Sequence, residues 1–192
     1  MPLPLSRRPT SWLRSIRRRG VGFTVALAIL AIAAGVTSGF AEVKDNPACE
    51  QFGWSIKREL ELFRDPYLEM VFSGATLGSV PDKGLVLELQ PHGTVDYVLA
   101  PGGKPKSDDT FAGLLFIWNV LQAGTYEVTL SGDAWIDLIQ DGKAQALSAE
   151  TINSNCSDAR KSMRFRLEPG PLTVQVSGAS AILIKLAILP GE

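Results

Sequence analysis

The feature of this 192-residue sequence that most constrains its fold is a series of short apolar segments separated by glycine and proline. These segments have the length of β-strands, and turn residues such as Ala123–Gly124 and Pro169–Gly170–Pro171 stand between them. The strands predicted in this way are 84–89, 113–120, 125–130, 134–140, 162–167, 172–177 and 182–188. Their number and spacing favour a mainly β fold, an antiparallel β-sandwich of the jelly-roll type.

Alternation within the strands supports this fold. In 162–167 the odd positions are apolar, and the even positions are Ser162, Arg164 and Arg166. Successive side chains of a strand point to opposite faces, so the pattern predicts one buried face and one solvated face for each of these strands.

Two segments lie outside the strand pattern. The apolar residues Phe52, Ile56, Leu60 and Phe63 recur every three or four positions, which predicts an amphipathic helix over 54–64 that ends before a proline. The stretch 91–110 has no apolar periodicity and is expected to be an exposed loop.

The N-terminus has the composition of an export signal. Residues 1–41 contain six arginines and no acidic residue, and an uncharged apolar run covers 21–36. Small residues at Gly39 and Ala41 match a cleavage site, which predicts cleavage after Ala41; an uncleaved signal anchor is the alternative. The predicted parts of the chain are a signal peptide (1–41), a leader with the amphipathic helix (42–65) and a sandwich domain (66–192) in the periplasm or secreted.

The remaining 151 residues form an acidic chain of one-domain size. They keep 13 of the 19 basic residues and all 20 acidic ones, a net charge of −7. Such a charge disfavours nucleic acid and, after signal cleavage, an anionic membrane surface as partners.

The cysteines predict one disulfide. Cys49 and Cys156 are the two cysteines of the chain, and an exported protein meets an oxidising compartment. A bridge across about 107 residues would remove roughly 4 to 5 kcal/mol of unfolded-state entropy.

Composition excludes several kinds of catalysis. Zinc and non-haem iron centres need several imidazoles or thiolates, whereas His92 is the one histidine and both cysteines are expected to be oxidised. Nucleophilic catalysis with a histidine base would depend on His92, which is expected in a solvated turn. No cofactor and no metal is therefore predicted, and paired carboxylates are the enzyme chemistry that remains open.

One candidate ligand site combines carboxylates with an indole. Asp133, Asp137 and Asp141 are four residues apart, so on a strand they would share a face with Trp135. Trp135 and Asp137 could form a sugar-stacking or calcium-binding patch, but an outward acidic face explains the pattern better. Trp54, Trp118 and Tyr126 are expected in the core.

The second candidate is a basic stripe. Arg160, Arg164 and Arg166 lie on one face of their predicted strand in an otherwise acidic domain. They could bind carboxylates of a polysaccharide or a partner protein, or pair across strands with Asp or Glu. As a binding surface, Arg164 and Arg166 should lack carboxylate partners in the free protein.

Two stretches carry a resemblance to known families. The segments AGTYEVTL at 123–130 and GPLTVQV at 170–176 resemble pre-peptidase C-terminal domains and carbohydrate-binding jelly rolls. The whole mature chain resembles a group of uncharacterised exported proteobacterial proteins in the residues Cys49, Trp54, Trp135–Ile136–Asp137, Cys156 and Arg160–Lys161–Ser162. These resemblances imply export and a β-sandwich, and they imply no activity.

The sequence thus predicts a non-catalytic binding or accessory module of the cell envelope, whose partner is an envelope glycan or a periplasmic protein. A small carboxylate-based glycan hydrolase or lyase is one alternative. A structural or inhibitory protein that binds by strand pairing is the other.

Overall fold

The computed structural model describes residues 46–103 and 107–191. The predicted signal peptide and its cleavage site lie outside these residues. None of the helices in the described part of the chain is long and apolar enough to cross a membrane.

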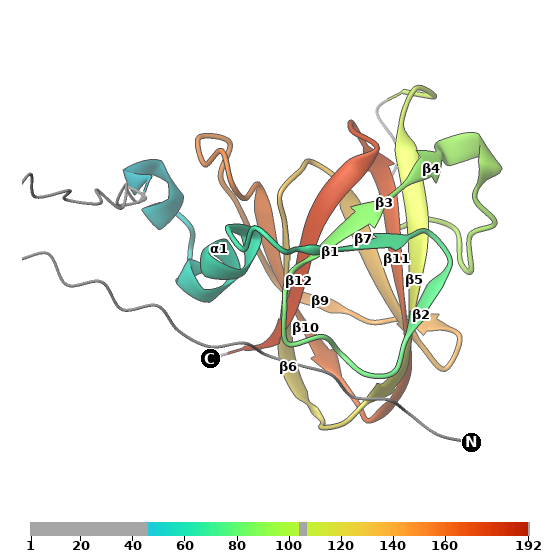
Figure 1. The fold of residues 1–192 in the computed structure, drawn as a ribbon. Coiled ribbons are helices and arrows are strands. Elements are labelled where there is room, and N and C mark those ends of the chain that lie inside the picture. The colour runs from blue at the N-terminus through green and yellow to red at the C-terminus, as the bar shows by residue number, and fades with distance from the viewer. Residues whose placement is uncertain (1–45, 104–106, 192) are drawn as a thin grey trace, which may run out of the picture. The chain divides into compact units, whose positions relative to one another are not determined.

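The fold is a β-sandwich of two sheets (Figure 1). The first sheet, sheet A, has the strand order β1 (Glu69–Phe72), β3 (Leu85–Glu88), β12 (Leu183–Pro190), β6 (Gly124–Leu130), β10 (Lys161–Leu167) and β9 (Leu147–Ile152). The second, sheet B, has the order β2 (Ala75–Leu77), β5 (Phe111–Val120), β11 (Gly170–Ala179), β7 (Trp135–Gln140) and β8 (Lys143–Ala144), and β4 (Gln90–Pro91) also pairs with β5. The predicted fold class is confirmed.

All seven predicted strands are present, and the sequence pattern missed β1, β2, β4, β8 and β9. β4 and β8 are two residues long, too short to show a periodicity. β9 is an edge strand with no fully buried residue, so its sequence LSAETI lacks an apolar run. Short and half-exposed strands carry little hydrophobic signal.

The expectation of purely antiparallel sheets is wrong at two pairs, because β1 runs parallel to β3 and β2 runs parallel to β5. The chain crosses from one sheet to the other between β1 and β2. Ser73 N donates to Glu88 O in sheet A, and Gly74 N donates to Leu114 O in sheet B. Gly74 has a φ of 92°, which favours glycine. The segment from β1 to β2 therefore adds a parallel edge strand first to sheet A and then to sheet B.

The inner faces of the two sheets form one apolar core. Its members alternate along the strands as predicted, for example Val174 and Val176 on β11 and Met163 and Phe165 on β10. Burial of this continuous apolar surface provides the main stabilisation of the sandwich.

The outer face of sheet A is covered by the segment 46–64, which contains the 3₁₀-helix η1 (Pro47–Glu50) and the helix α1 (Lys57–Phe63) (Figure 1). Helix α1 starts three residues later than predicted and ends before Pro66 as expected. Ile56, Leu60 and Phe63 pack with Ala187 of β12. The predicted solvated face of β10 is therefore wrong, because Ser162 is fully buried under this segment.

The predicted disulfide between Cys49 and Cys156 is confirmed. The two Cα atoms lie 4.6 Å apart, within the range of an ordinary bridge. Asn153 Nδ2 also donates to Ala48 O at 2.5 Å, so a hydrogen bond lies beside the bridge. Together they join η1 to the loop between β9 and β10.

Residues 92–103 begin with the 3₁₀-helix η2 (His92–Thr94) and then run over the outer face of sheet B. The side-chain amide of Gln175 on β11 accepts from Val98 N at 3.0 Å and donates to Leu99 O at 3.0 Å. The first part of the stretch predicted as an exposed loop is thus hydrogen-bonded to a buried side chain of sheet B.

Candidate functional site

Trp135 and Asp137 lie next to each other on the outer face of sheet B, and both fasten the loop after η2. Trp135 Nε1 donates to Asp137 Oδ1 at 2.8 Å, and Gly102 N donates to Asp137 Oδ2 at 3.0 Å. A Cβ atom at Gly103 would lie 2.6 Å from Trp135 Cδ2, so the backbone packs directly on the indole. The carboxylate of Asp137 is buried, and Asp141 is exposed in a turn, so the three aspartates do not form one acidic face.

The three arginines of the predicted stripe have protein partners. Arg164 Nε and Nη2 donate to Glu127 Oε1 at 2.9 and 2.5 Å. Arg160 Nη1 donates to Ser154 O at 2.6 Å, and Arg166 Nε lies 3.5 Å from Glu168 Oε1. The condition set for a binding surface, Arg164 and Arg166 without carboxylate partners, is therefore not met, and Arg164 has the cross-strand pairing that was the alternative. The reason for Arg164 is register, since Glu127 lies directly opposite on β6.

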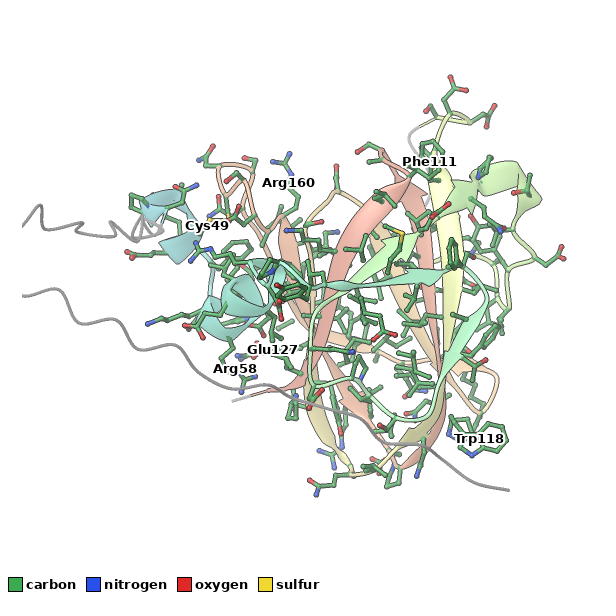
Figure 2. The ribbon with its side chains drawn as sticks, viewed as in Figure 1. Cys49, Arg58, Phe111, Trp118, Glu127 and Arg160 are labelled. Atoms are coloured by element: carbon green, nitrogen blue, oxygen red, sulfur yellow. A yellow bond between two sulfur atoms is a disulfide. The ribbon has the colours of Figure 1, made fainter. Side chains whose placement is uncertain are left out.

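The three aromatic residues predicted in the core behave differently. Tyr126 is buried as expected, and its hydroxyl donates to Gln122 O at 2.9 Å. Trp54, in the segment 46–64, is half-buried against sheet A. Trp118 is 74 % exposed and points away from the sandwich (Figure 2), so its predicted burial is wrong. It follows Phe116 by two positions on β5, on the face that does not meet the core.

A cavity with a volume of about 650 Å³ lies within the segment 46–64. We call it the N-terminal hollow. Its lining residues are Asn46, Cys49, Glu50, Phe52, Trp54, Ser55, Ile56, Lys57, Leu60, Glu61 and Arg64. A volume of this size falls within the range of ligand pockets, roughly 300 to 1,000 Å³.

The hollow has a mixed lining of apolar and charged side chains. Ile56 and Leu60 are buried, whereas Glu50, Lys57 and Glu61 are exposed. Arg64 also lines it and lies 3.4 Å from Asp158 in an ion pair. The rim therefore presents both signs of charge around an apolar surface.

Trp54 is the most firmly held aromatic residue of the hollow. Its Nε1 donates to Ser162 Oγ at 3.1 Å, and the guanidinium of Arg164 lies 4.3 Å from the ring centroid. Ser162 Oγ also accepts from Thr129 Oγ1 at 2.9 Å. Because these partners belong to β6 and β10, sheet A fixes the orientation of the indole before any ligand binds.

Two buried carboxylates lie behind the hollow, between α1 and sheet A. Glu59 and Glu127 are 1 % and 2 % exposed, and neither lines the cavity. Burial raises the pKa of Glu59 above its usual 4.5, and the neighbouring Glu127 carboxylate raises it further. Our sequence reasoning missed this pair. A signal existed, because Glu59 is three residues after Ile56 and four before Phe63, on the apolar face of the helix.

His92 and Tyr97 are a further pair of titratable side chains in contact. His92 Nδ1 lies 2.8 Å from Tyr97 Oη, and burial raises the pKa of that phenol. No group of three or more His, Cys, Asp or Glu side chains placed to hold a metal ion occurs in 46–103 and 107–191.

A scan against protein-family models found no matching family for this chain, and a search of curated proteins found no match either.

Proposed function

We propose that this protein is an exported, non-catalytic binding module of the cell envelope that holds a segment of a partner protein in the N-terminal hollow. The arginine-rich, apolar N-terminus and the disulfide support export to the periplasm or beyond the cell. The observation that carries the binding proposal is the hollow, with its mixed apolar and charged lining and a tryptophan fixed by sheet A.

The lining favours a peptide segment as the ligand. Phe52, Trp54, Ile56 and Leu60 offer apolar contact for one or two buried side chains of a partner. Charges of both signs at Glu50, Lys57 and Glu61 can meet the polar positions that flank those side chains.

The hydrolase alternative has less support. Glu50 and Glu61 are the carboxylates that line the hollow, and both are exposed. A general acid of a glycosidase needs an apolar environment that keeps it protonated, which an exposed carboxylate lacks.

Strand pairing also has less support. The edge strands β1, β2 and β8 are four residues long or shorter. The six-residue edge strand β9 carries Glu150, which forms a 2.9 Å ion pair with the buried Lys161. Short edges and inward charges discourage pairing with another chain.

A glycan-binding face is the second candidate function, and Trp118 favours it. An indole exposed on a flat sheet can stack on a sugar ring. This site lies on sheet B, whereas the hollow lies on the outer face of sheet A, so the two candidates can be tested separately.

The test compares three variants of the purified, disulfide-bonded protein on an array of peptides from envelope proteins and an array of envelope glycans. Ser55→Trp fills the hollow from its exposed wall, Ser148→Trp adds the same bulk on β9, and Trp118→Ala removes the exposed indole. We expect Ser55→Trp to weaken peptide binding at least tenfold and Ser148→Trp to leave it unchanged. Peptide binding unaffected by Ser55→Trp would overturn the proposal, and glycan binding lost in Trp118→Ala would favour the second candidate.

A further inference from the structure

Glu59 is the one acidic residue in the described part of the chain whose buried carboxylate oxygens both lack a hydrogen-bond partner. A buried ionised carboxylate without partners is costly, since it loses its water and gains nothing in return. The neutral acid is much cheaper to bury. The packing of α1 against sheet A therefore favours a protonated Glu59.

The groups that face Glu59 do not remove this cost. Glu127 approaches from β6 and carries a like charge, and Arg164 of β10 directs two of its donors to Glu127. On α1, the neighbouring Arg58 donates to Pro190 O at 2.7 Å and favours ionisation weakly (Figure 2 shows Arg58 and Glu127). Lys185 of β12 donates its Nζ to Phe63 O at 2.6 Å.

The segment that carries Glu59 is fixed at both ends. The Cys49–Cys156 bridge holds its start, and the pairing of β1 with β3 holds its end from Glu69 onward. Between these points the segment is held by the apolar contacts of Ile56, Leu60 and Phe63. Polar contacts to the sandwich add to them, from Gly53, Trp54, Arg58, the carbonyl of Phe63 and Arg64. We call residues 50–68 the strap. Its middle can leave sheet A while its ends stay in place.

We propose that the strap is a pH-sensitive device: it lies against sheet A while Glu59 is neutral, and its middle lifts when Glu59 releases a proton to water. The hollow is built almost entirely from strap residues, so its walls hold together while the strap is docked. This consequence for the ligand rests on the proposed function, whereas the movement of the strap does not.

The direction of the pH effect follows from the proton balance. The docked strap binds more protons than the lifted strap, because the pKa of Glu59 is raised above 4.5 in the docked state and returns to its usual value in water. Docking is therefore fully favourable below pH 4.5 and weakens as the pH rises through the docked pKa of Glu59. One proton per opening event allows the opening constant to rise by up to about tenfold per pH unit in that window.

Hydrogen exchange followed by mass spectrometry tests this inference on the disulfide-bonded protein between pH 4 and pH 8. The readout is the opening constant of residues 56–64 after correction for the intrinsic exchange rate, with β11 as the internal reference. We expect the opening constant of 56–64 to rise with pH and that of β11 to stay constant. Glu59→Gln should remove the rise, because the amide keeps the shape of the carboxyl and cannot ionise.

Glu61→Gln is the matched control, since Glu61 is on the same helix and exposed. It should behave like the unmodified protein. Glu59→Met provides a second neutral side chain in case the amide fails to fold, with the same expected loss of pH dependence. Equal pH dependence in the unmodified protein and in both Glu59 variants would overturn the inference. Because exchange needs no ligand, a failure of peptide binding in the Ser55→Trp test would leave this result intact.

Discussion

The protein buries two interfaces of different chemistry, and both use sheet A. Between the two sheets a large cluster of buried apolar side chains forms the core, from Leu87 on β3 to Val174 on β11. Between the strap and the outer face of sheet A, apolar side chains alternate with buried polar ones, including Glu59, Glu127 and Ser162. A disulfide joins the second interface and no covalent bond joins the first. The sandwich core combines apolar burial with the hydrogen bonds of its strands. The strap combines apolar contacts with buried charged groups and a covalent link.

Loss of the disulfide should have the largest effect. The double variant Cys49→Ser/Cys156→Ser removes a cross-link over 107 residues, and the expected loss in the free energy of unfolding is about 4 kcal/mol. Urea denaturation of the oxidised protein and of the variant measures it. Exchange at β11 should still be the slowest in the variant. If the strap and β11 lost protection equally, the two interfaces would be one cooperative unit and the comparison would fail.

A cavity in the sandwich core should have the next largest effect. Leu87 is fully buried between the sheets, and Leu87→Ala should cost about 3 kcal/mol, through lost apolar burial and an unfilled cavity. Leu60→Ala is the matched truncation under the strap, where the segment can settle into the space, and it should cost less. Thermal and urea unfolding of both variants measure the difference. Equal losses would mean that the strap is packed as rigidly as the core.

Removal of the cation beside the buried carboxylates should have a moderate effect. Arg164→Met leaves Glu127 buried without its ionic partner, and we expect a loss of about 1 to 3 kcal/mol at pH 7. The effect stays below that of a fully buried pair because the Arg164 side chain is 27 % exposed and solvent screens part of the interaction. When Glu127→Gln is added to Arg164→Met, the buried charge is removed, so the double variant should regain most of the stability that Arg164→Met loses. Additive losses in this double-mutant cycle would contradict the pairing.

The sequence predicted the sandwich better than the strap, for physical reasons visible in particular residues. Alternation along β10 and β11 indicates burial between the sheets, and two cysteines in a chain whose N-terminus has the composition of an export signal predict their own pairing. What covers the outer faces is a tertiary property that a single strand does not encode. Ser162 and Arg164 therefore had the pattern of solvated residues although Trp54 of the segment 46–64 packs on them. Trp118 was expected in the core as a large aromatic residue, although nothing among the described residues buries it.

The smallest expected effect separates the two arginines that the sequence placed on one stripe. Arg166 is 72 % exposed, and its carboxylate partner Glu168 lies at the 3.5 Å distance of a loose ion pair. Exposed pairs contribute between about 0 and 1 kcal/mol, because solvent screens the charges and fixing two flexible side chains costs entropy. Arg166→Gln should therefore leave the urea midpoint nearly unchanged, whereas Arg164→Gln on the same face should lower it clearly. The two substitutions remove the same charge, and the surroundings of the two side chains differ. A difference between their effects on stability therefore measures what the strap contributes. Equal and small effects would show that the strap does not bury Arg164 enough to matter in solution, and the contrast between the two interfaces would then rest on Glu59 alone.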